Sequence, residues 1–271
     1  MTAAEAEPSY LQTAIDAVRR AGDLQRQAVG TSFEITKKGR IDLVTDVDLA
    51  VERMIRALIA ERHPGHDVLA EELGGPPGGG ASRYCWICDP IDGTSNFAHG
   101  LPIFCATVAL EIDGELACGA VYDPMRDELF TAERGRGAFL NGTRMQVSET
   151  TALVDALLVT GFPYSVQETL DEHVALFGRF LSRARAVRRL GSAALDACYV
   201  AAGRLDGFWE HGLNAWDIAA GVLLVREAGG LVTDLDGGPF DLRSGRILAT
   251  NGLVHDAMRQ VIGDNPPAAG S

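Results

Sequence analysis

Two aspartates next to an apolar run form the most informative pattern in this sequence. Residues 84–88 are expected to form a strand that stops at Asp89, and Pro90 then begins a turn that leads to Asp92. The fixed backbone of Pro90 brings the second carboxylate beside the first. Two carboxylates this close repel each other unless a cation lies between them. Oxygen ligands of this kind suit hard cations such as Mg²⁺ or Ca²⁺, so the pattern predicts a metal site.

The residues that follow, Gly93, Thr94 and Ser95, are typical of a phosphate-binding turn. At the start of a helix their free backbone N–H groups can bind phosphate oxygens. An ordinary acidic turn is the alternative, because Asp, Pro and Gly are common turn residues. Other acids also lie at the ends of expected elements, and although each could be a helix cap or a solvated residue, together they favour a shared metal site. These acids are Asp46, Asp48, Glu71, Glu72 and Asp217.

The composition limits the classes of partner. The chain has 271 residues and a formal net charge of −13, with a pI near 4.9, so nucleic acids and anionic membranes are not expected to bind. An acidic protein that accepts an anionic substrate needs cations, which again points to metal ions. No apolar run is long enough for a membrane helix, and no signal peptide is evident. The odd number of cysteines, five, fits reduced thiols, so we expect a cytoplasmic protein.

Hydrophobic spacing divides the chain into two lobes. Helices are expected over residues 9–29 and 46–62, with a hairpin over 33–45, a loop over 74–80 and a largely antiparallel sheet formed by strands between residues 68 and 147. The second half alternates, with strands over 156–160, 186–190, 207–210, 231–234 and 247–250, and helices over 167–181, 192–202, 214–228 and up to about residue 262. We place the N-terminal lobe at 1–150, the C-terminal lobe at 151–264 and a disordered tail at 265–271.

Cys85 and Cys88 form a CxxC pattern that invites a redox or zinc interpretation. Both lie in an expected strand, where alternation of side chains directs them to opposite faces. We therefore expect two core thiols.

Four segments resemble the inositol monophosphatase family in order and spacing. They are DLVTDVD at 42–48, AEE at 70–72, WICDPIDGTSNF at 86–97 and WDIAAG at 216–221. The resemblance covers nearly the whole chain. It implies an α/β (α+β) fold built as a layered α-β-α-β-α sandwich, and a phosphatase that uses two to three Mg²⁺ ions. A homodimer and inhibition by lithium are also implied.

The resemblance assigns roles to individual residues. It implies that Asp48 and the Thr94 hydroxyl orient and deprotonate the attacking water, and that Glu71 also supports a third ion through water. One ion is expected to activate this water and another to stabilise the leaving alkoxide. Lys37 lies where the family has a lysine near the metals, with Lys38 as its neighbour. The implied metal ligands are Glu71, Asp89, the carbonyl of Ile91, Asp92 and Asp217.

The substrate is expected to be a small phosphate monoester. Backbone groups of Gly93, Thr94 and Ser95 would bind the phosphate. The resemblance points to Glu210 and to residues 191–194, Ala193 among them, as contacts of the alcohol. Myo-inositol 1-phosphate is the leading candidate. Histidinol phosphate, a fructose bisphosphate, NADP and a 3′-phosphonucleotide remain alternatives with the same chemistry. A regulatory protein on the phosphatase fold is the alternative of another class.

Overall fold

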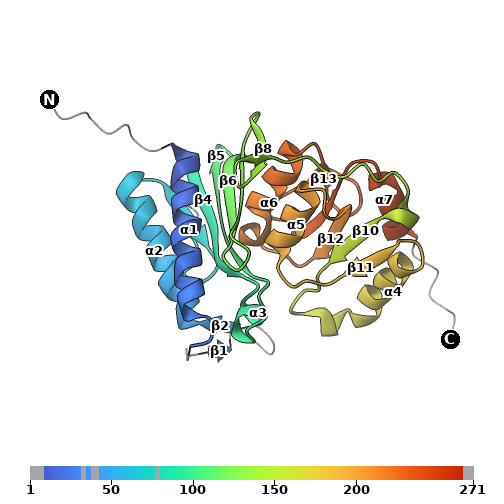
Figure 1. Cartoon of the computed structure of the whole chain (residues 1–271), viewed down its shortest axis with the longest axis horizontal. Coiled ribbons are helices and arrows are strands. Elements are labelled where there is room, and N and C mark those ends of the chain that lie inside the picture. The colour runs from blue at the N-terminus through green and yellow to red at the C-terminus, as the bar shows by residue number, and fades with distance from the viewer. Residues whose placement is uncertain (1–8, 32–34, 38–42, 77–79, 265–271) are drawn as a thin grey trace.

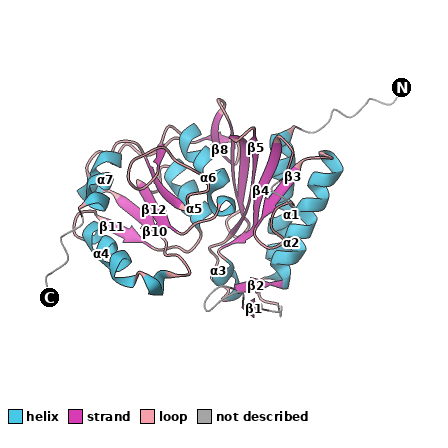
Figure 2. Ribbon diagram, turned by 180° about the vertical axis from the view of Figure 1, so that it is seen from behind, coloured by secondary structure: helices cyan, strands magenta, loops and turns pink. Residues whose placement is uncertain are grey.

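The protein consists of five alternating layers of helices and sheets, seen edge-on in the computed structural model (Figure 1). The structure describes residues 9–31, 35–37, 43–76 and 80–264. From one end to the other the layers are α1 and α2, a seven-stranded sheet, α5 and α6, a five-stranded sheet, and α4 and α7 (Figures 1 and 2). This is the predicted α-β-α-β-α sandwich. The expected tail at 265–271 and the turn of the first hairpin lie outside the described residues.

The first layer is formed by α1 (Tyr10–Ala28) and α2 (Asp46–Arg62), which match the predicted helices. The apolar face of each helix packs on the seven-stranded sheet, where Val18 and Ile55 join Trp86 in one buried cluster. Thr45 caps α2, and its side chain accepts a hydrogen bond from the backbone of Asp48. The interpretation of Asp46 as the helix cap was therefore wrong, because a cap must precede the first helical residue. Ahead of α2, β1 (Ile35–Lys37) and β2 (Leu43–Thr45) form the predicted hairpin.

The seven-stranded sheet has the order β3-β4-β5-β6-β7-β8-β9. Strands β3 and β4 are parallel and all later neighbours are antiparallel, so the sheet is largely antiparallel as predicted. The Asp113-Gly114 turn joins β5 to β6, with φ of 52° at Asp113. The strands are β3 (Asp67–Ala70), β4 (Tyr84–Asp92), β5 (Cys105–Ile112), β6 (Glu115–Asp123), β7 (Glu128–Glu133), β8 (Gly137–Leu140) and β9 (Thr143–Arg144).

Strand β4 departs from the prediction at its end. The strand was expected to stop at Asp89, but it continues to Asp92 with a shift in its pairing to β5 between these two residues. Pro90 lies within this irregular stretch. Proline has no N–H to donate to the sheet, and it is tolerated where the regular hydrogen-bond pairing is interrupted. An irregularity of this kind re-aims side chains without ending the strand. Both aspartates therefore project from one rigid strand and not from a loop.

The five-stranded sheet belongs to the second half of the chain and has the order β11-β10-β12-β14-β13. Its outer face is covered by α4 (Leu170–Leu181) and α7 (His255–Gly263). Helix α4 starts three residues later than expected, because Val166–Glu168 form a separate 3-10 turn. The strands are β10 (Leu157–Thr160), β11 (Ala186–Arg188), β12 (Gly207–His211), β13 (Leu231–Thr233) and β14 (Arg246–Thr250).

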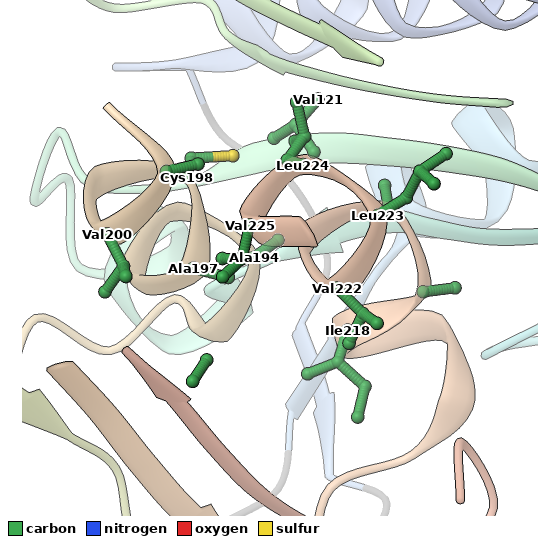
Figure 3. Packing of buried hydrophobic residues seen from close by; sticks show 14 of the residues in the cluster. Val121, Ala194, Ala197, Cys198, Val200, Ile218, Val222, Leu223, Leu224 and Val225 are labelled. Carbon is green, nitrogen blue, oxygen red and sulfur yellow. The ribbon is translucent and has the colours of Figure 1, made fainter. Parts of the chain in front are cut away.

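The central helices α5 (Ala193–Ala201) and α6 (Ala215–Glu227) lie between the two sheets and are apolar on nearly all sides. Figure 3 shows Val222, Leu224 and Val225 of α6 packed among side chains of α5 and of the first sheet. A Cβ atom on Gly221 would lie 2.6 Å from that of Ala197, so glycine allows the two helices to approach closely. This layer carries the N-termini of both helices toward the end of β4.

The cysteines and the lengths of the helices were also the subject of expectations from the sequence. All five cysteines are free, and Cys85 and Cys88 pack on opposite faces of the first sheet, as alternation along a strand predicts. Within the described ranges, no helix combines the length and the apolar character needed to cross a bilayer.

Candidate active site

Three aspartates converge where the first sheet meets the central helices. Asp89 and Asp92 project from the end of β4, and Asp217 projects from the first turn of α6. Each offers a carboxylate oxygen that lies within 4.8 Å of the others. Asp89 is 2% exposed and Asp92 8% exposed, so the group is largely withdrawn from water. Buried carboxylates at this spacing form a donor set suited to a hard divalent cation.

The electrostatics of the cluster favour a bound cation. Burial raises the pKa of Asp89 well above its ordinary value, and the charges of Glu71, Asp92 and Asp217 raise it further. Burial likewise raises the pKa of Asp217, and Asp92 adds to that effect. Acids that resist ionisation in the bare protein become favourable ligands once positive charge lies between them.

Asp92 is fixed by the N-terminus of α5. Burial raises its pKa to about 6, although hydrogen bonds from Ser192, Ala194 and Ala193 act in the opposite direction. The Ser192 hydroxyl and the backbone N–H of Ala194 donate to Oδ2 at 2.5 and 2.8 Å, and the N–H of Ala193 donates to Oδ1 at 3.3 Å. One aspartate on the first sheet is thus oriented by a helix from the second half of the chain.

Glu71 lies in the turn after β3 and lines the same pocket. Its turn is supported by Glu52, a fully buried residue of α2. The Glu52 carboxylate accepts the backbone N–H of Glu72 at 2.8 Å and of Leu73 at 3.1 Å, and it forms an ion pair with Arg56 at 2.8 Å. Glu71 is outside the group of three mutually close acids, but its charge is the largest one acting on Asp89.

Asp48 and Thr94 lie side by side, as predicted for the pair that acts on water. The Thr94 hydroxyl lies 3.3 Å from Oδ1 of Asp48 and donates to the carbonyl of Ile91 at 2.9 Å. The other oxygen of Asp48 accepts hydrogen bonds from the backbone and hydroxyl of Thr45, at 2.8 and 2.5 Å. The backbone N–H of Ile91 donates to Asp89 at 2.9 Å. This network joins the start of α2 to the end of β4.

The predicted phosphate-binding turn opens a short helix, α3 (Thr94–Ala98). Gly93 precedes it with φ of +95°, and a Cβ there would lie 2.9 Å from the carbonyl oxygen of Ile103. Only glycine fits this position without strain. Gly93, Thr94 and Ser95 all line the pocket.

The pocket also contains two further buried carboxyls. Burial and the charge of Asp217 raise the pKa of Glu210 to about 8, against the opposing effect of Arg189. Asp196 of α5 is 1% exposed, and its Oδ1 has no hydrogen-bond partner within the described part of the chain. Arg189 is the one cationic side chain that lines the described pocket. Gly161 makes room for Glu210, because a Cβ there would lie 2.0 Å from the carboxylate.

Comparison with known proteins places this geometry in a family. The model of the inositol monophosphatase family matches residues 7–264. The chain belongs to the inositol monophosphatase family. Members of this family hydrolyse phosphate monoesters, and the chain is a phosphatase.

Similar proteins carry two kinds of name. An inositol-1-monophosphatase of Synechocystis sp. is 46% identical over 259 residues, which are 95% of this chain and 90% of that protein. The Nus factor SuhB of Escherichia coli K12 is 44% identical over 250 residues, which are 92% of this chain and 93% of that protein. Among solved structures, an inositol monophosphatase from Anabaena (Nostoc) sp. PCC 7120 has a TM-score of 0.87 at 41% identity and covers 96% of this chain and 97% of its own.

Metal dependence is a property of the family. An IMPase/NADP phosphatase that is 26% identical, with a TM-score of 0.79 and coverage of 92% of both chains, was solved in complex with Mg²⁺ and phosphate. The buried carboxylates of this chain provide oxygen donors suited to the same kind of ion.

The structure brings all but one of the predicted site residues to one pocket or its immediate support. Lys37 lies in β1, and its side chain is not among the described features. The supporting roles of four residues were not predicted. Glu52 and Ser192 act across 20 and 100 residues of sequence, whereas Thr45 lies only three residues from Asp48. The pocket is lined by Glu71, Asp89, Ile91, Asp92, Gly93, Thr94, Ser95, Ala193, Glu210, Asp217 and their neighbours, and the residues that were missed are Thr45, Glu52, Ser192 and Asp196.

Proposed function

We propose that this inositol monophosphatase hydrolyses myo-inositol 1-phosphate with Mg²⁺ as its cofactor. The observation that supports this most strongly is the convergence of Asp89, Asp92 and Asp217 within 4.8 Å in a largely buried position. An acid cluster without a cation would cost stability, whereas a divalent ion converts it into a binding site.

In this proposal two to three Mg²⁺ ions would be held by residues of the turn after β3, of β4 and of α6. Bound Mg²⁺ supplies positive charge to the phosphate and lowers the pKa of a coordinated water. Asp89, on which the charges of Glu71, Asp92 and Asp217 all act, would be shared between ions. The proposed ligands are Glu71, Asp89, the carbonyl of Ile91, Asp92 and Asp217.

Asp48 and Thr94 are proposed to hold the attacking water and to accept its proton. Thr45 occupies one oxygen of Asp48, so the other oxygen is left to face the Thr94 hydroxyl at 3.3 Å. The hydroxyl can accept from water while it donates to a neighbouring oxygen. The same orientation lets a proton pass from water toward the carboxylate. Glu71, which lines the same pocket, would support the third ion through a water.

Backbone and carboxyl groups are proposed to bind the two ends of the substrate. The N–H groups at the start of α3, from Gly93, Thr94 and Ser95, would donate to the phosphate oxygens. Ala193 and Glu210 also line the pocket, where they would contact the hydroxyl groups of the alcohol. A buried carboxyl group selects hydroxyl groups well, because an alcohol without them leaves it unpaired.

Phosphate release from a panel of substrates, with and without Mg²⁺, tests the proposal. The panel contains inositol 1-phosphate, histidinol phosphate, fructose 1,6-bisphosphate, NADP and a 3′-phosphonucleotide. We expect Mg²⁺-dependent release that is strongest with inositol 1-phosphate. A preference for another member would retain the metal site and refute the proposed alcohol. Absence of release from every member would refute the catalytic proposal.

A regulatory role is a second candidate, because relatives above 40% identity carry the name Nus factor SuhB. We propose that any such role coexists with catalysis, since the acid cluster is complete. Affinity capture from lysate with the wild-type chain and with Asp92→Asn separates the two roles. Equal recovery of transcription proteins by both would support a role independent of catalysis, and recovery of none would oppose it.

Assembly as a cytoplasmic homodimer and inhibition by lithium also remain proposals. Light scattering tests the dimer, cell fractionation tests the location, and inhibition assays test the effect of lithium.

A further inference from the structure

A second cavity, of about 870 Å³, lies in the C-terminal half of the chain, beside the outer helices of the five-stranded sheet. Its walls come from α4, α7, the end of β12 and the start of β14. Pro163 and Gly212 line both this cavity and the active-site pocket, so the two spaces share a wall. The volume lies in the range of small-molecule sites.

Three arginines from three separate elements line this cavity. Arg179 extends from α4, Arg246 from β14 and Arg259 from α7. Their concentration contrasts with the formal net charge of −13 of the whole chain. Two exposed acids, Glu172 and Asp236, also line the cavity and leave an excess of positive charge in its lining.

Each arginine has at least one identified anchor, and Arg246 also lies 3.9 Å from Asp236. Arg179 donates to the carbonyl of Val261 at 3.1 Å, Arg246 pairs with Asp234 at 2.7 Å, and Arg259 pairs with Asp256 at 3.4 Å. A guanidinium carries five N–H donors in a planar fork, so one anchor orients the group and leaves donors for a ligand. Planar donors of this kind match carboxylate and phosphate oxygens.

Two histidines also line the cavity and bring ring nitrogens that can donate hydrogen bonds. The rings of His173 and His211 lie 5.2 Å apart at 83°, and both residues line the space. Burial, together with the neighbouring His173 and Arg246, lowers the pKa of His211 to about 4. The three groups are therefore close enough to oppose each other's charge, and an anion among them would relieve this repulsion.

The remaining lining is apolar and includes Leu176, Leu235 and Ile262. We infer that this cavity is a second ligand site, separate from the catalytic pocket, for a small organic anion with a phosphate or carboxylate head and an apolar body. The head contacts the arginines and histidines, and the body lies against the leucine and isoleucine side chains. The shared wall of Pro163 and Gly212 places the ligand next to the active-site pocket.

The test uses phenylphosphonate, which joins an anionic head to an apolar ring and cannot be hydrolysed as an ester. Full-length protein labelled in its histidine rings is titrated in excess EDTA, so that metal-dependent binding in the catalytic pocket is absent. We expect saturable movement of the NMR signals of His173 and His211. The signals of His63 and His66, in the aromatic cluster with Tyr84, serve as internal controls. Equal movement of the signals of all four histidines, or no movement of any, would refute the proposed site.

Variants identify the groups that bind. Arg179→Gln and Arg259→Gln should each lower the affinity for phenylphosphonate by about tenfold, because each removes a charge-assisted contact. Arg185→Gln is the matched control, since this exposed arginine pairs with Asp155 and does not line the cavity. Either cavity variant suffices if the other does not fold. Wild-type affinity in the folded variants would contradict the proposal. Inorganic phosphate and benzoate, titrated in parallel, decide between the two head groups.

Discussion

The hydroxyl of Ser192 donates a hydrogen bond to Oδ2 of Asp92 at 2.5 Å, across 100 residues of sequence. Ser192 also caps α5, since its oxygen accepts the N–H of Leu195 at 3.4 Å. One side chain therefore begins a central helix and orients an aspartate of the acid cluster. The position of Asp92 depends on the packing of the second half of the chain against the first sheet.

Replacement of Ser192 should weaken both stability and metal binding. Ser192→Ala removes the cap and one bond to a carboxylate, which should lower the free energy of unfolding by about 1–3 kcal/mol. Loss of a supporting hydrogen bond should also raise the Mg²⁺ concentration for half-maximal activity by roughly tenfold. Urea denaturation and Mg²⁺ titration measure the two effects. Ser182→Ala, at an exposed hydroxyl that donates to Arg179, is the control and should change neither.

Gly161 should be required for the position of Glu210. Gly161→Ala places a Cβ 2.0 Å from the Glu210 carboxylate, which must then move out of its place in the pocket. We expect kcat/KM for the preferred substrate to fall by about tenfold or more, since a misplaced substrate contact is costly. The Mg²⁺ dependence should stay as in the wild type. Gly178→Ala in α4 has open space around its Cβ and should keep full activity. Normal kcat/KM in Gly161→Ala would argue against a role for Glu210.

Glu210 should make the metal-free protein less stable at alkaline pH. Its pKa is raised from 4.5 to about 8 in the folded state, mainly by burial, so the folded protein holds a proton that the unfolded chain releases. This contribution to stability is complete below pH 4.5 and is lost as the pH rises through 8. Glu210→Gln mimics the protonated side chain. In EDTA it should be more stable than the wild type at pH 9 and similar at pH 5. Parallel stability curves for the two proteins would show that Glu210 does not titrate in this way.

His66 should contribute to loss of stability in acid. Its Nδ1 accepts a hydrogen bond from Trp86 at 3.1 Å, and its ring stacks on Tyr84 at 4.3 Å. Burial lowers its pKa below the ordinary value of 6.5, despite the opposing charge of Asp67. Stability from the neutral ring is therefore present above pH 6.5 and is lost as the pH falls through the lowered pKa. Unfolding measured from pH 7 to 5 should have a shallower pH dependence in His66→Gln, whereas the exposed His99→Gln should follow the wild type.

Much of the site could be predicted because its acids lie within short local patterns. Asp89 and Asp92 are two positions on one strand, and Asp217 lies in the first turn of a helix with a clear glycine end at Gly229-Gly230. These local signals are enough to predict which acidic residues lie at the end of a strand or at the start of a helix. They predicted the helix from Asp46 to Arg62 to the residue.

The remaining features depend on contacts that no local pattern contains. Glu52 supports the turn of Glu71 from another element, and Asp196 is buried only because α5 lies between two sheets. The extension of β4 beyond Asp89 was missed, because Pro90 favours a turn unless a neighbouring strand accommodates it. The second cavity was also missed, because its arginines are spread from residue 179 to residue 259 and no local pattern brings them together.

The roles of Mg²⁺ and of Asp92 in hydrolysis can be measured as phosphate release from inositol 1-phosphate across Mg²⁺ concentrations, in the wild type and in Asp92→Asn. If the acid cluster is a catalytic metal site, it predicts release that requires Mg²⁺ in the wild type. In the folded variant it predicts a loss of more than roughly a hundredfold, because even outer-shell partners of a metal site contribute that much. Asp23→Asn, on the exposed face of α1, should behave as the wild type. Undiminished release by Asp92→Asn at saturating Mg²⁺, or release by the wild type in EDTA, would contradict the account.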